Sequence, residues 1–181
     1  MKGKLIIVSG PSGSGKSTVT KIVKDKLNIP LSISATTRSP RDGEIDGKDY
    51  FFLSEEEFKN KIINDEFYEY AKVHGNYYGT LKKTVEDNLE KGLNVILEID
   101  VQGALIAKEK KKDAILVFFR TKDMEILEKR LRDRKTDSEE VIQTRLKNAE
   151  AELEYENKYN YTIINESLED SIQELIDIIN K

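Results

Sequence analysis

Residues 10–17 have the types and the spacing that bind phosphate. They match the pattern G-x-x-x-x-G-K-[ST] at every defined position. In this pattern the N–H groups of a glycine-rich loop surround the phosphates of a nucleoside triphosphate, Lys16 reaches the β- and γ-phosphates, and the Ser17 hydroxyl ligates Mg²⁺. The residues that we expect to contact the triphosphate are Gly10, Ser12, Gly13, Ser14, Gly15, Lys16, Ser17 and Thr18.

The flanks of this motif predict a turn from a buried strand into a helix. Residues 5–8 are a short branched apolar run, which is typical of a buried strand. After the motif, apolar residues recur at helical spacing, at Val19, Ile22, Val23 and Leu27. The alternative is a glycine-rich turn that binds nothing. Because the match has eight residues and both flanks fit, we favour the phosphate site.

The rest of the chain alternates buried strands with helices. Strands are predicted at 31–34, 94–100, 114–119 and 161–164, and helices near 102–110, 123–133, 138–156 and 168–179. This order predicts an α/β fold with a doubly wound parallel sheet and helices on both faces. Ligands of such sheets bind at the carboxyl ends of the strands, where Gly10, Ser34 and Asp100 fall.

Residues 31–80 follow a different pattern and predict a small mixed α/β insertion beside the sheet. A strand is expected at 50–53, and a capping box at 54–57 opens the next helix. Residues 67–73 and 76–79 predict a hairpin around His74 and Gly75, where a turn or packing role for the histidine is favoured over catalysis. Thr80 is expected to cap a helix that ends at Gly92.

Composition restricts the classes of protein that fit. A length of 181 residues predicts one domain, 1–181, and the absence of cysteine excludes disulfides and thiolate metal sites. A net charge of −4 argues against nonspecific binding to nucleic acid or to anionic membranes. No apolar run approaches the length of a membrane span, so we expect a cytoplasmic protein with no membrane partner. No His, Cys or carboxylate cluster resembles a protein metal cage, so any Mg²⁺ is expected to arrive with the nucleotide.

A second group of residues suits a second phosphate. Arg38 and Arg41 are three residues apart in a polar loop beside Tyr50, a grouping that fits a phosphate with several acceptor oxygens. Two solvated loop arginines are the alternative, and these residues alone leave it open. Glu98 and Asp100 are two apart at the end of a strand, so they share one face of the sheet.

Several motifs of the chain resemble those of the guanylate kinase family. They read T-T-R-x-x-R-x-x-E-x-x-G-x-x-Y-x-F at 36–52, E-x-A-x-V-H-G-N-Y-Y-G-T at 69–80, I-D-V-Q-G at 99–103, R-x-T-x-x-E at 134–139 and R-L at 145–146. With the phosphate loop they span nearly the whole chain in the order of the family. Glu98 stands where many relatives carry Asp, and its longer side chain is expected to reach Lys16 or a Mg²⁺-bound water.

The resemblance implies a reaction in which ATP and GMP give ADP and GDP with Mg²⁺, with dGMP as a further acceptor. It implies that Arg38, Arg41, Tyr50 and Tyr78 hold the GMP phosphate, with Glu44 supporting the arginines. Ser34, Glu69, Thr80, Glu98 and Asp100 complete the implied GMP site. The implied catalytic residues are Lys16, Asp100, Arg130, Arg134 and Arg145.

The chemistry of guanine agrees with this assignment. A carboxylate such as Glu69 accepts from N1–H and the exocyclic amine, while the hydroxyl of Ser34 or Thr80 can donate to O6. Adenine inverts this edge and would leave Glu69 without a donor. The GMP phosphate is mostly dianionic at neutral pH, so its oxygen needs no general base, and catalysis becomes positioning and charge neutralisation.

The resemblance also divides the chain into moving parts. A GMP-binding lobe is implied at about 34–80 and a helical lid at about 125–145, around a core of 1–33, 81–124 and 146–181. Closure of both parts would exclude water from the transferring phosphates. Against a role for the lid arginines, Glu128, Asp133 and Glu139 provide enough carboxylates to pair with them on a solvated surface.

Two other functions fit parts of the pattern. Guanylate-kinase-like domains of scaffold proteins bind protein partners instead of catalysing, but they typically have a degraded phosphate loop, whereas Lys16 and Ser17 are present here. A kinase of the same fold that acts on another phosphorylated small molecule is the second alternative. The expected partners are the small-molecule substrates ATP and GMP, and the expected assembly is a monomer or a simple homo-oligomer.

Overall fold

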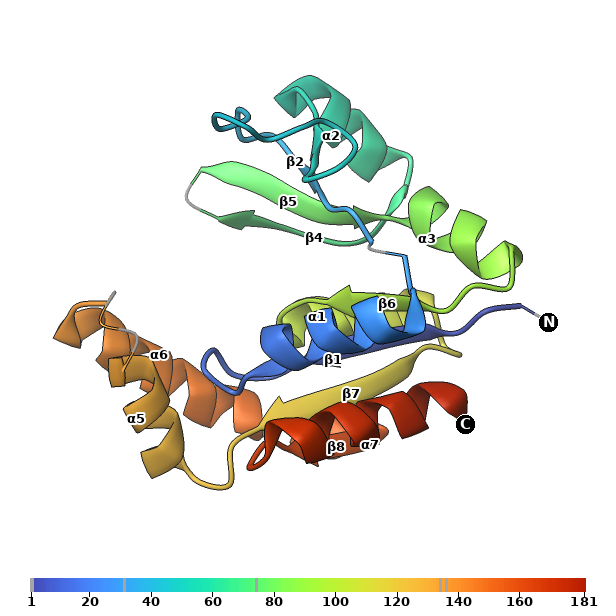
Figure 1. The fold of residues 1–181 in the computed structure, drawn as a ribbon. Helices are drawn as coiled ribbons and strands as arrows, with labels where there is room; N and C mark the ends of the chain where they lie inside the picture. The colour runs from blue at the N-terminus through green and yellow to red at the C-terminus, as the bar shows by residue number, and fades with distance from the viewer. Residues whose placement is uncertain (1, 31, 74, 134, 136) are drawn as a thin grey trace.

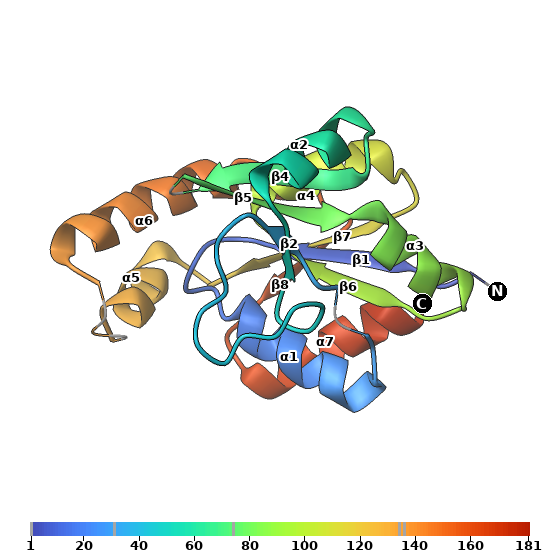
Figure 2. The ribbon, with the colours of Figure 1, turned by 90° about the horizontal axis from the view of Figure 1, so that it is seen from above.

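The computed structural model describes residues 2–30, 32–73, 75–133, 135 and 137–181. Figure 1 shows a central layer of strands and helices, a smaller lobe above it and an arm of two helices at one side. The lobe and the arm both lie near the carboxyl edge of the central strands, and Figure 2 shows this arrangement from above. This edge is therefore the place where the three parts meet.

The central layer is a parallel sheet of four strands in the order β6-β1-β7-β8. In register, Ile7 of β1 lies between Leu97 of β6 and Leu116 of β7. All five residues of β1 are buried, because helices cover both faces of the sheet. The strands are β1 (Leu5–Ser9), β6 (Val95–Glu98), β7 (Ile115–Arg120) and β8 (Tyr161–Ile164).

Alternate residues of these strands build two apolar cores. Ile6 and Val8 of β1 pack with α1 and α7 on one face, whereas Leu5 and Ile7 pack with α3 and α4 on the other. The helices are α1 (Lys16–Leu27), α7 (Leu168–Asn180), α3 (Lys82–Glu90) and α4 (Val101–Lys110). The prediction of a doubly wound parallel α/β sheet is confirmed.

The lobe is built on a second, mixed sheet in the order β3-β2-β5-β4. Its strands are β2 (Ala35–Thr36), β3 (Phe51–Phe52), β4 (Phe67–Val73) and β5 (Asn76–Leu81), and α2 (Glu55–Ile63) covers it. Phe58 of α2 stacks on Phe67 with ring centroids 4.4 Å apart, and both are buried. The predicted capping box is confirmed, because the Ser54 and Glu57 side chains bond each other's backbone N–H groups.

Two local predictions are wrong. The strand expected at 31–34 lies further along the chain, as β2 at Ala35–Thr36, where it pairs with β3 and β5. Thr80 does not cap a helix, because it belongs to β5 and its hydroxyl donates to Glu69 Oε1 at 2.7 Å. The helix begins after Leu81 without a side-chain cap. In both cases sheet pairing overrode the local signal. The predicted turn residue His74 lies outside the described residues.

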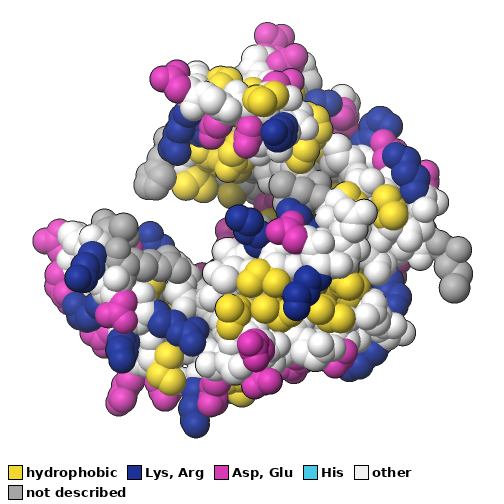
Figure 3. All heavy atoms as spheres, in the orientation of Figure 1, with side chains coloured by type: hydrophobic (Ala, Val, Ile, Leu, Met, Phe, Trp, Pro, Cys, Tyr) yellow, Lys and Arg dark blue, Asp and Glu magenta, His cyan; other side chains and the backbone are white. Residues whose placement is uncertain are grey.

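The arm consists of α5 (Met124–Asp133) and α6 (Glu139–Leu153), followed by the short 3₁₀ helix η1 (Glu156–Lys158). Leu127 and Leu131 of α5 pack against Ile142 and Ala149 of α6, so the arm has a small core of its own. Figure 3 shows a deep hollow between the arm, the lobe and the edge of the central sheet. No helix in the described part of the chain is long and apolar enough to cross a membrane.

Candidate nucleotide-binding site

The phosphate loop joins β1 to α1 at the carboxyl edge of the central sheet. Gly10 and Gly15 have φ values of +136° and +87°, a region that favours glycine. A β-carbon on Gly10 would lie 2.0 Å from the carbonyl oxygen of Phe119, and one on Gly15 would lie 2.1 Å from the side-chain nitrogen of Asn165. Only glycine fits at these two positions, which explains the first and last glycines of the motif.

The first turn of α1 holds the lysine and the first serine after it. Lys16 Nζ donates to the carbonyl oxygen of Pro11 at 3.3 Å, so the lysine side chain folds back toward the loop. The Ser17 hydroxyl donates to Glu98 at the end of β6. The first turn of α1 has no acidic residue, so no carboxylate within that turn neutralises the positive end of the helix. This arrangement can accept a phosphate.

The arginines of the arm fall into two groups. Arg145 Nη1 donates to Ser12 Oγ of the phosphate loop at 3.0 Å, and Arg130 Nη1 donates to the carbonyl oxygen of Ser14 at 3.4 Å. The carboxylates of Glu128 and Glu139, the expected surface partners, are hydrogen-bonded to Arg132 instead. Two of the three predicted lid arginines, Arg130 and Arg145, therefore contact the phosphate loop. Arg134, the third, lies outside the described residues.

Asn165 is a residue of this site that the sequence analysis missed. It is 6% exposed, its Nδ2 donates to the carbonyl oxygen of Ser14 at 2.8 Å, and its Oδ1 accepts from Ser171. Arg130 Nη2 in turn donates to the Asn165 carbonyl oxygen at 2.8 Å. The available signal was its place directly after β8, at the same edge as the predicted acids.

A cavity of about 390 Å³ lies beside the phosphate loop at this point. It is lined by Gly13, Gly15, Thr18, Arg130, Asn165, Glu166 and Leu168. The residues come from the loop, from the first turn of α1, from the arm and from the segment after β8. The cavity is therefore continuous with the place where a triphosphate would lie.

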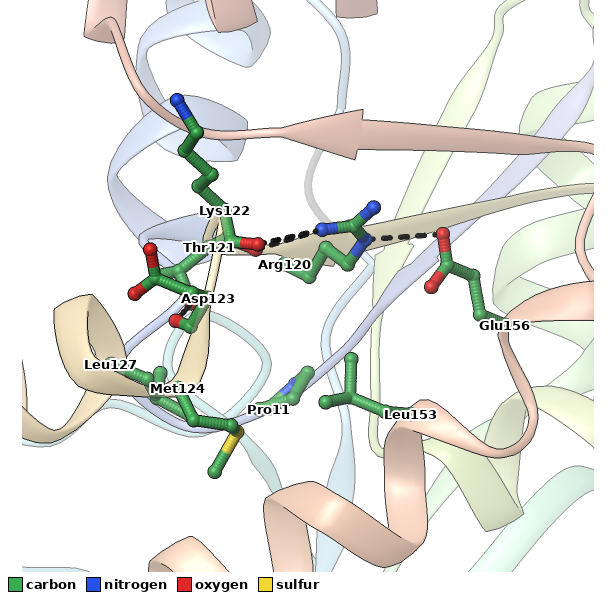
Figure 4. A pocket seen from close by; sticks show the side chains of 9 residues that line it. All are labelled: Pro11, Arg120, Thr121, Lys122, Asp123, Met124, Leu127, Leu153 and Glu156. Atoms are coloured by element: carbon green, nitrogen blue, oxygen red, sulfur yellow. Dashed lines mark hydrogen bonds and ion pairs between the residues drawn. The ribbon is translucent and has the colours of Figure 1, made fainter.

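A second cavity, of about 200 Å³, lies between the base of the arm and the phosphate-loop residue Pro11 (Figure 4). Its apolar wall includes Leu127 and Leu153, from the two helices of the arm. Arg120 Nε donates to Glu156 Oε1 at 3.2 Å. Arg120 precedes the arm and Glu156 follows it, so this ion pair ties together the two chain segments that enter and leave the arm.

The lobe gathers the predicted phosphate-binding residues around Glu44. The Glu44 carboxylate accepts from Arg38 Nη1 and Nη2 at 3.0 and 2.8 Å and from the Arg41 backbone N–H at 2.7 Å. These bonds lower the pKa of the Glu44 carboxyl, and the hydrogen bond from the Arg38 guanidinium has the largest effect. The Arg38 guanidinium lies 5.4 Å from the ring centre of Tyr50, which packs edge-on against Tyr78. Arg38, Glu44, Tyr50 and Tyr78 therefore form one cluster, which Arg41 adjoins through its backbone N–H.

Glu69, Thr80 and Asp100 form a separate polar group between the lobe and the central sheet. Thr80 donates to Glu69, and Asp100 Oδ1 accepts from the Gly103 N–H at 2.7 Å, which caps α4. Burial raises the pKa of the Glu69 carboxyl, the Thr80 hydrogen bond opposes this shift, and the neighbouring Asp100 carboxylate adds to it. Ser34 lines a different cavity, of about 190 Å³, together with Ser17 and Glu98.

The parallel sheet, with a complete phosphate loop at its carboxyl edge, defines a phosphate-loop α/β kinase fold. The model of the guanylate kinase family matches residues 2–181. The chain belongs to this family, whose members are enzymes and whose activity is phosphoryl transfer from ATP to GMP.

Individual relatives agree with the family match. The chain is 61% identical over 177 residues to the guanylate kinase of Fusobacterium nucleatum. This aligned region covers 98% of this chain and 96% of that protein. The chain is 50% identical over 179 residues to the guanylate kinase of Clostridium tetani, and the aligned region covers 99% of this chain and 86% of that protein. The crystal structure of the guanylate kinase from Anaplasma phagocytophilum is similar, with a TM-score of 0.74, 36% identity, and coverage of 99% of this chain and 85% of that chain.

Proposed function

We propose that this chain transfers the γ-phosphoryl group of ATP to GMP, and also to dGMP, at the hollow between the lobe, the arm and the sheet edge. The observation that carries the proposal is the pairing, across this hollow, of a complete phosphate loop with the Arg38–Glu44 cluster and the Glu69–Thr80–Asp100 group. A phosphate loop alone would fit many nucleotide-binding proteins. The second phosphate site and the carboxylate beside it are what favour a nucleoside monophosphate acceptor.

ATP is proposed to lie along the phosphate loop, Gly10 to Thr18. Its triphosphate would accept hydrogen bonds from the loop N–H groups, and Lys16 would turn from the Pro11 carbonyl to the β- and γ-phosphates. Its base would enter the cavity beside Asn165 and Arg130. Arg130 and Arg145, with Arg134, would neutralise the charge that spreads over the transferring phosphoryl group.

The residues at the end of β6 fit a magnesium ion bound with the nucleotide. Ser17 and Glu98 place a hydroxyl and a carboxylate in contact beside the loop, and both are hard oxygen donors of the kind that Mg²⁺ takes. No cluster of three or more His, Cys, Asp or Glu side chains that could hold a metal alone occurs among the described residues. A bound Mg²⁺ would supply positive charge that neutralises the phosphates of the nucleotide. Ser17 would ligate it, and Glu98 would accept hydrogen bonds from its water.

GMP is proposed to bind between the lobe and the sheet. Arg38, Arg41, Tyr50 and Tyr78 would donate to its phosphate, while Glu44 holds the Arg38 guanidinium and the backbone of Arg41. Glu69, Thr80 and Asp100 would face the base, and Ser34, which lines the cavity of Ser17 and Glu98 in this structure, would reach the base on closure of the lobe. The ionised Glu69 carboxylate would accept from guanine N1–H and the exocyclic amine, and a hydroxyl would donate to O6.

The reaction needs no general base. An oxygen of the GMP phosphate, whose second pKa is about 6, attacks the γ-phosphorus as the bond to the leaving ADP oxygen breaks. The arginines and Lys16 stabilise the charge on the moving phosphoryl group. Residues 34–80 and 125–145 would close over the substrates to exclude water, around a core of 1–33, 81–124 and 146–181.

The first test is a coupled assay of ADP release from Mg-ATP with GMP, dGMP, AMP, CMP, UMP and dTMP in parallel. Turnover with GMP, or with GMP and dGMP, supports the proposal. Turnover with another monophosphate alone would keep the kinase and overturn the guanine assignment. Tight GMP binding with no turnover would instead favour a binding module.

Two variants on one helix provide the control. Lys16→Met removes the ammonium at the phosphate loop and should lower kcat by about 10²-fold or more. Lys26→Met removes a charge of the same kind from the exposed far end of α1 and should leave kcat unchanged. Equal activity of the two variants would contradict the role of Lys16.

A further inference from the structure

Gly103 lies in the first turn of α4 and faces two carboxylates from different elements. Its N–H donates to Asp100 Oδ1 at 2.7 Å. A β-carbon built on Gly103 would lie 3.2 Å from Glu69 Oε2 and 3.3 Å from Asp100 Oδ1. Both distances are tighter than ordinary van der Waals contact, so any other residue type would press on the two carboxylates.

The backbone does not explain this glycine. Gly103 lies within a regular helix, outside the left-handed region that glycine alone adopts readily. Glycine inside a helix costs about 0.5–1 kcal/mol relative to alanine. Gly3 and Gly79, which also lack a positive φ, are required by backbone, because their β-carbons would first meet the carbonyl oxygens of Leu93 and Glu69. At Gly103, by contrast, the nearest atoms to an added β-carbon belong to the side chains of Glu69 and Asp100.

We propose that Gly103 is a positioning residue that sets the selection of guanine, because its missing side chain leaves the Glu69 carboxylate free to meet the base. This inference rests on the proposed role of Glu69 and Asp100 in the GMP site. A β-carbon at position 103 would displace the Glu69 carboxylate by a few tenths of an ångström. That displacement would lengthen the bonds from N1–H and from the exocyclic amine to Glu69.

The same β-carbon would change the charge balance of Glu69. The groups that act on it are Thr80 of β5, Asp100 before α4, and Lys110 at the end of α4. Burial and Asp100 raise the pKa of the Glu69 carboxyl, and Thr80 and Lys110 oppose them. A methyl group at position 103 adds burial without adding a hydrogen-bond donor, so it shifts this pKa further upward. Only the ionised carboxylate accepts from both guanine donors.

The test compares GMP with IMP, which lacks the exocyclic amine, in the wild type and in Gly103→Ala. The variant is expected to lower the ratio of kcat/KM for GMP to that for IMP by about three- to tenfold, because GMP loses a bond that IMP never makes. The KM for ATP should stay within about twofold. The acidic limb of the pH profile of kcat/KM for GMP should move to higher pH. Ile106→Ala, on the exposed side of the same helix, should change none of these values.

A second variant separates bulk from charge. Gly103→Ser adds the same β-carbon together with a hydroxyl that can donate to a carboxylate, so it should lower the GMP-to-IMP ratio with a smaller shift of the pH profile. A folded Gly103→Ala enzyme with unchanged ratio and unchanged pH profile would overturn the inference. So would an equal rise of the KM values for ATP and GMP. A wild-type enzyme that turns over neither GMP nor dGMP would refute the proposed function itself.

Discussion

Glu69 carries a charge that its surroundings disfavour. Burial raises the pKa of its carboxyl, and the Asp100 carboxylate adds to that shift. The folded state therefore holds the Glu69 proton to higher pH than the unfolded chain does. Stability then falls as pH rises from below the unfolded pKa, about 4.3, through the folded pKa. At neutral pH the ionised Glu69 destabilises the fold, which fits a group retained for binding.

Glu69→Gln should therefore separate stability from activity. At pH 7 its Tm is expected to equal or exceed that of the wild type, and the difference should vanish below about pH 4, where Glu69 is protonated in both states. The kcat/KM for GMP should fall by about 10²-fold or more, because the amide presents a donor to guanine donors. Thermal melts at several pH values and the ADP-release assay measure both effects. A lower Tm at pH 7 would contradict burial as the main cause of the shift.

Glu66 provides a control of opposite sign on the same segment. The pKa of the Glu66 carboxyl is lowered, chiefly by the hydrogen bond from Lys61, and its side chain is 41% exposed. The charge of Glu66 stabilises the fold above its unfolded pKa, and this contribution is lost as pH falls through the folded pKa. Glu66→Gln should lower the Tm slightly at pH 7 and leave the kcat/KM for GMP unchanged.

At the scale of elements, the arm presents arginines with two different surroundings. Arg132 is bound by Glu128 and Glu139, so it joins α5 to the start of α6. Arg145 contacts Ser12 of the phosphate loop and the Asp137 carboxylate, which lies 3.1 Å from its Nε. The same helix pair therefore carries one arginine that holds the arm together and one that reaches the phosphate loop.

This difference predicts that substitution of Arg145 affects kcat, whereas substitution of Arg132 affects stability. Arg145→Ala should lower kcat by about 10²- to 10³-fold, because it removes a donor to the transferring phosphates. Arg132→Ala should lower the Tm slightly and leave kcat within about twofold, because its partners are exposed carboxylates. Steady-state kinetics with both substrates saturating decide between them. Similar losses of kcat in the two variants would mean that both act only by holding the arm.

Local sequence signals predicted the elements whose determinants are local. The phosphate loop with its strand and helix, the capping box at Ser54 and the alternation of buried strands depend on neighbours in the chain. Long-range pairing decided the rest. Thr80 has a side chain suited to a helix cap, yet pairing of β4 with β5 places it against Glu69. Asn165 joins the site only because β8 lies beside β7, which no spacing in the sequence shows.

At the scale of the whole molecule, the lobe meets the sheet layer through the buried Tyr68 of β4, which packs with Ala104 and Ala107 of α4, and through ion pairs at its base. Asp65 at the base of the lobe accepts from Lys110 of α4 and from Lys82 of α3, and these two bonds lower its pKa to about 2. Arg120 and Glu156 bracket the arm in the same way. Partly exposed ion pairs of this kind hold orientation weakly, so by themselves they would not prevent the two parts from rotating about their bases.

We predict that the hollow closes during the reaction, because water that reached the open site could take the γ-phosphoryl group of ATP. The absence of cysteine allows specific labelling, with Glu56→Cys on α2 and Glu140→Cys on α6, both exposed. Energy transfer between dyes at these positions should rise when GMP and a non-hydrolysable ATP analogue bind together, and rise less with GMP alone. A pair at Glu109 and Glu174, both on the central layer, should show no change. If the lobe–arm pair also stays constant while both ligands are bound, the lobe and arm do not close, and water must be excluded by the substrates and the arginines in the open hollow.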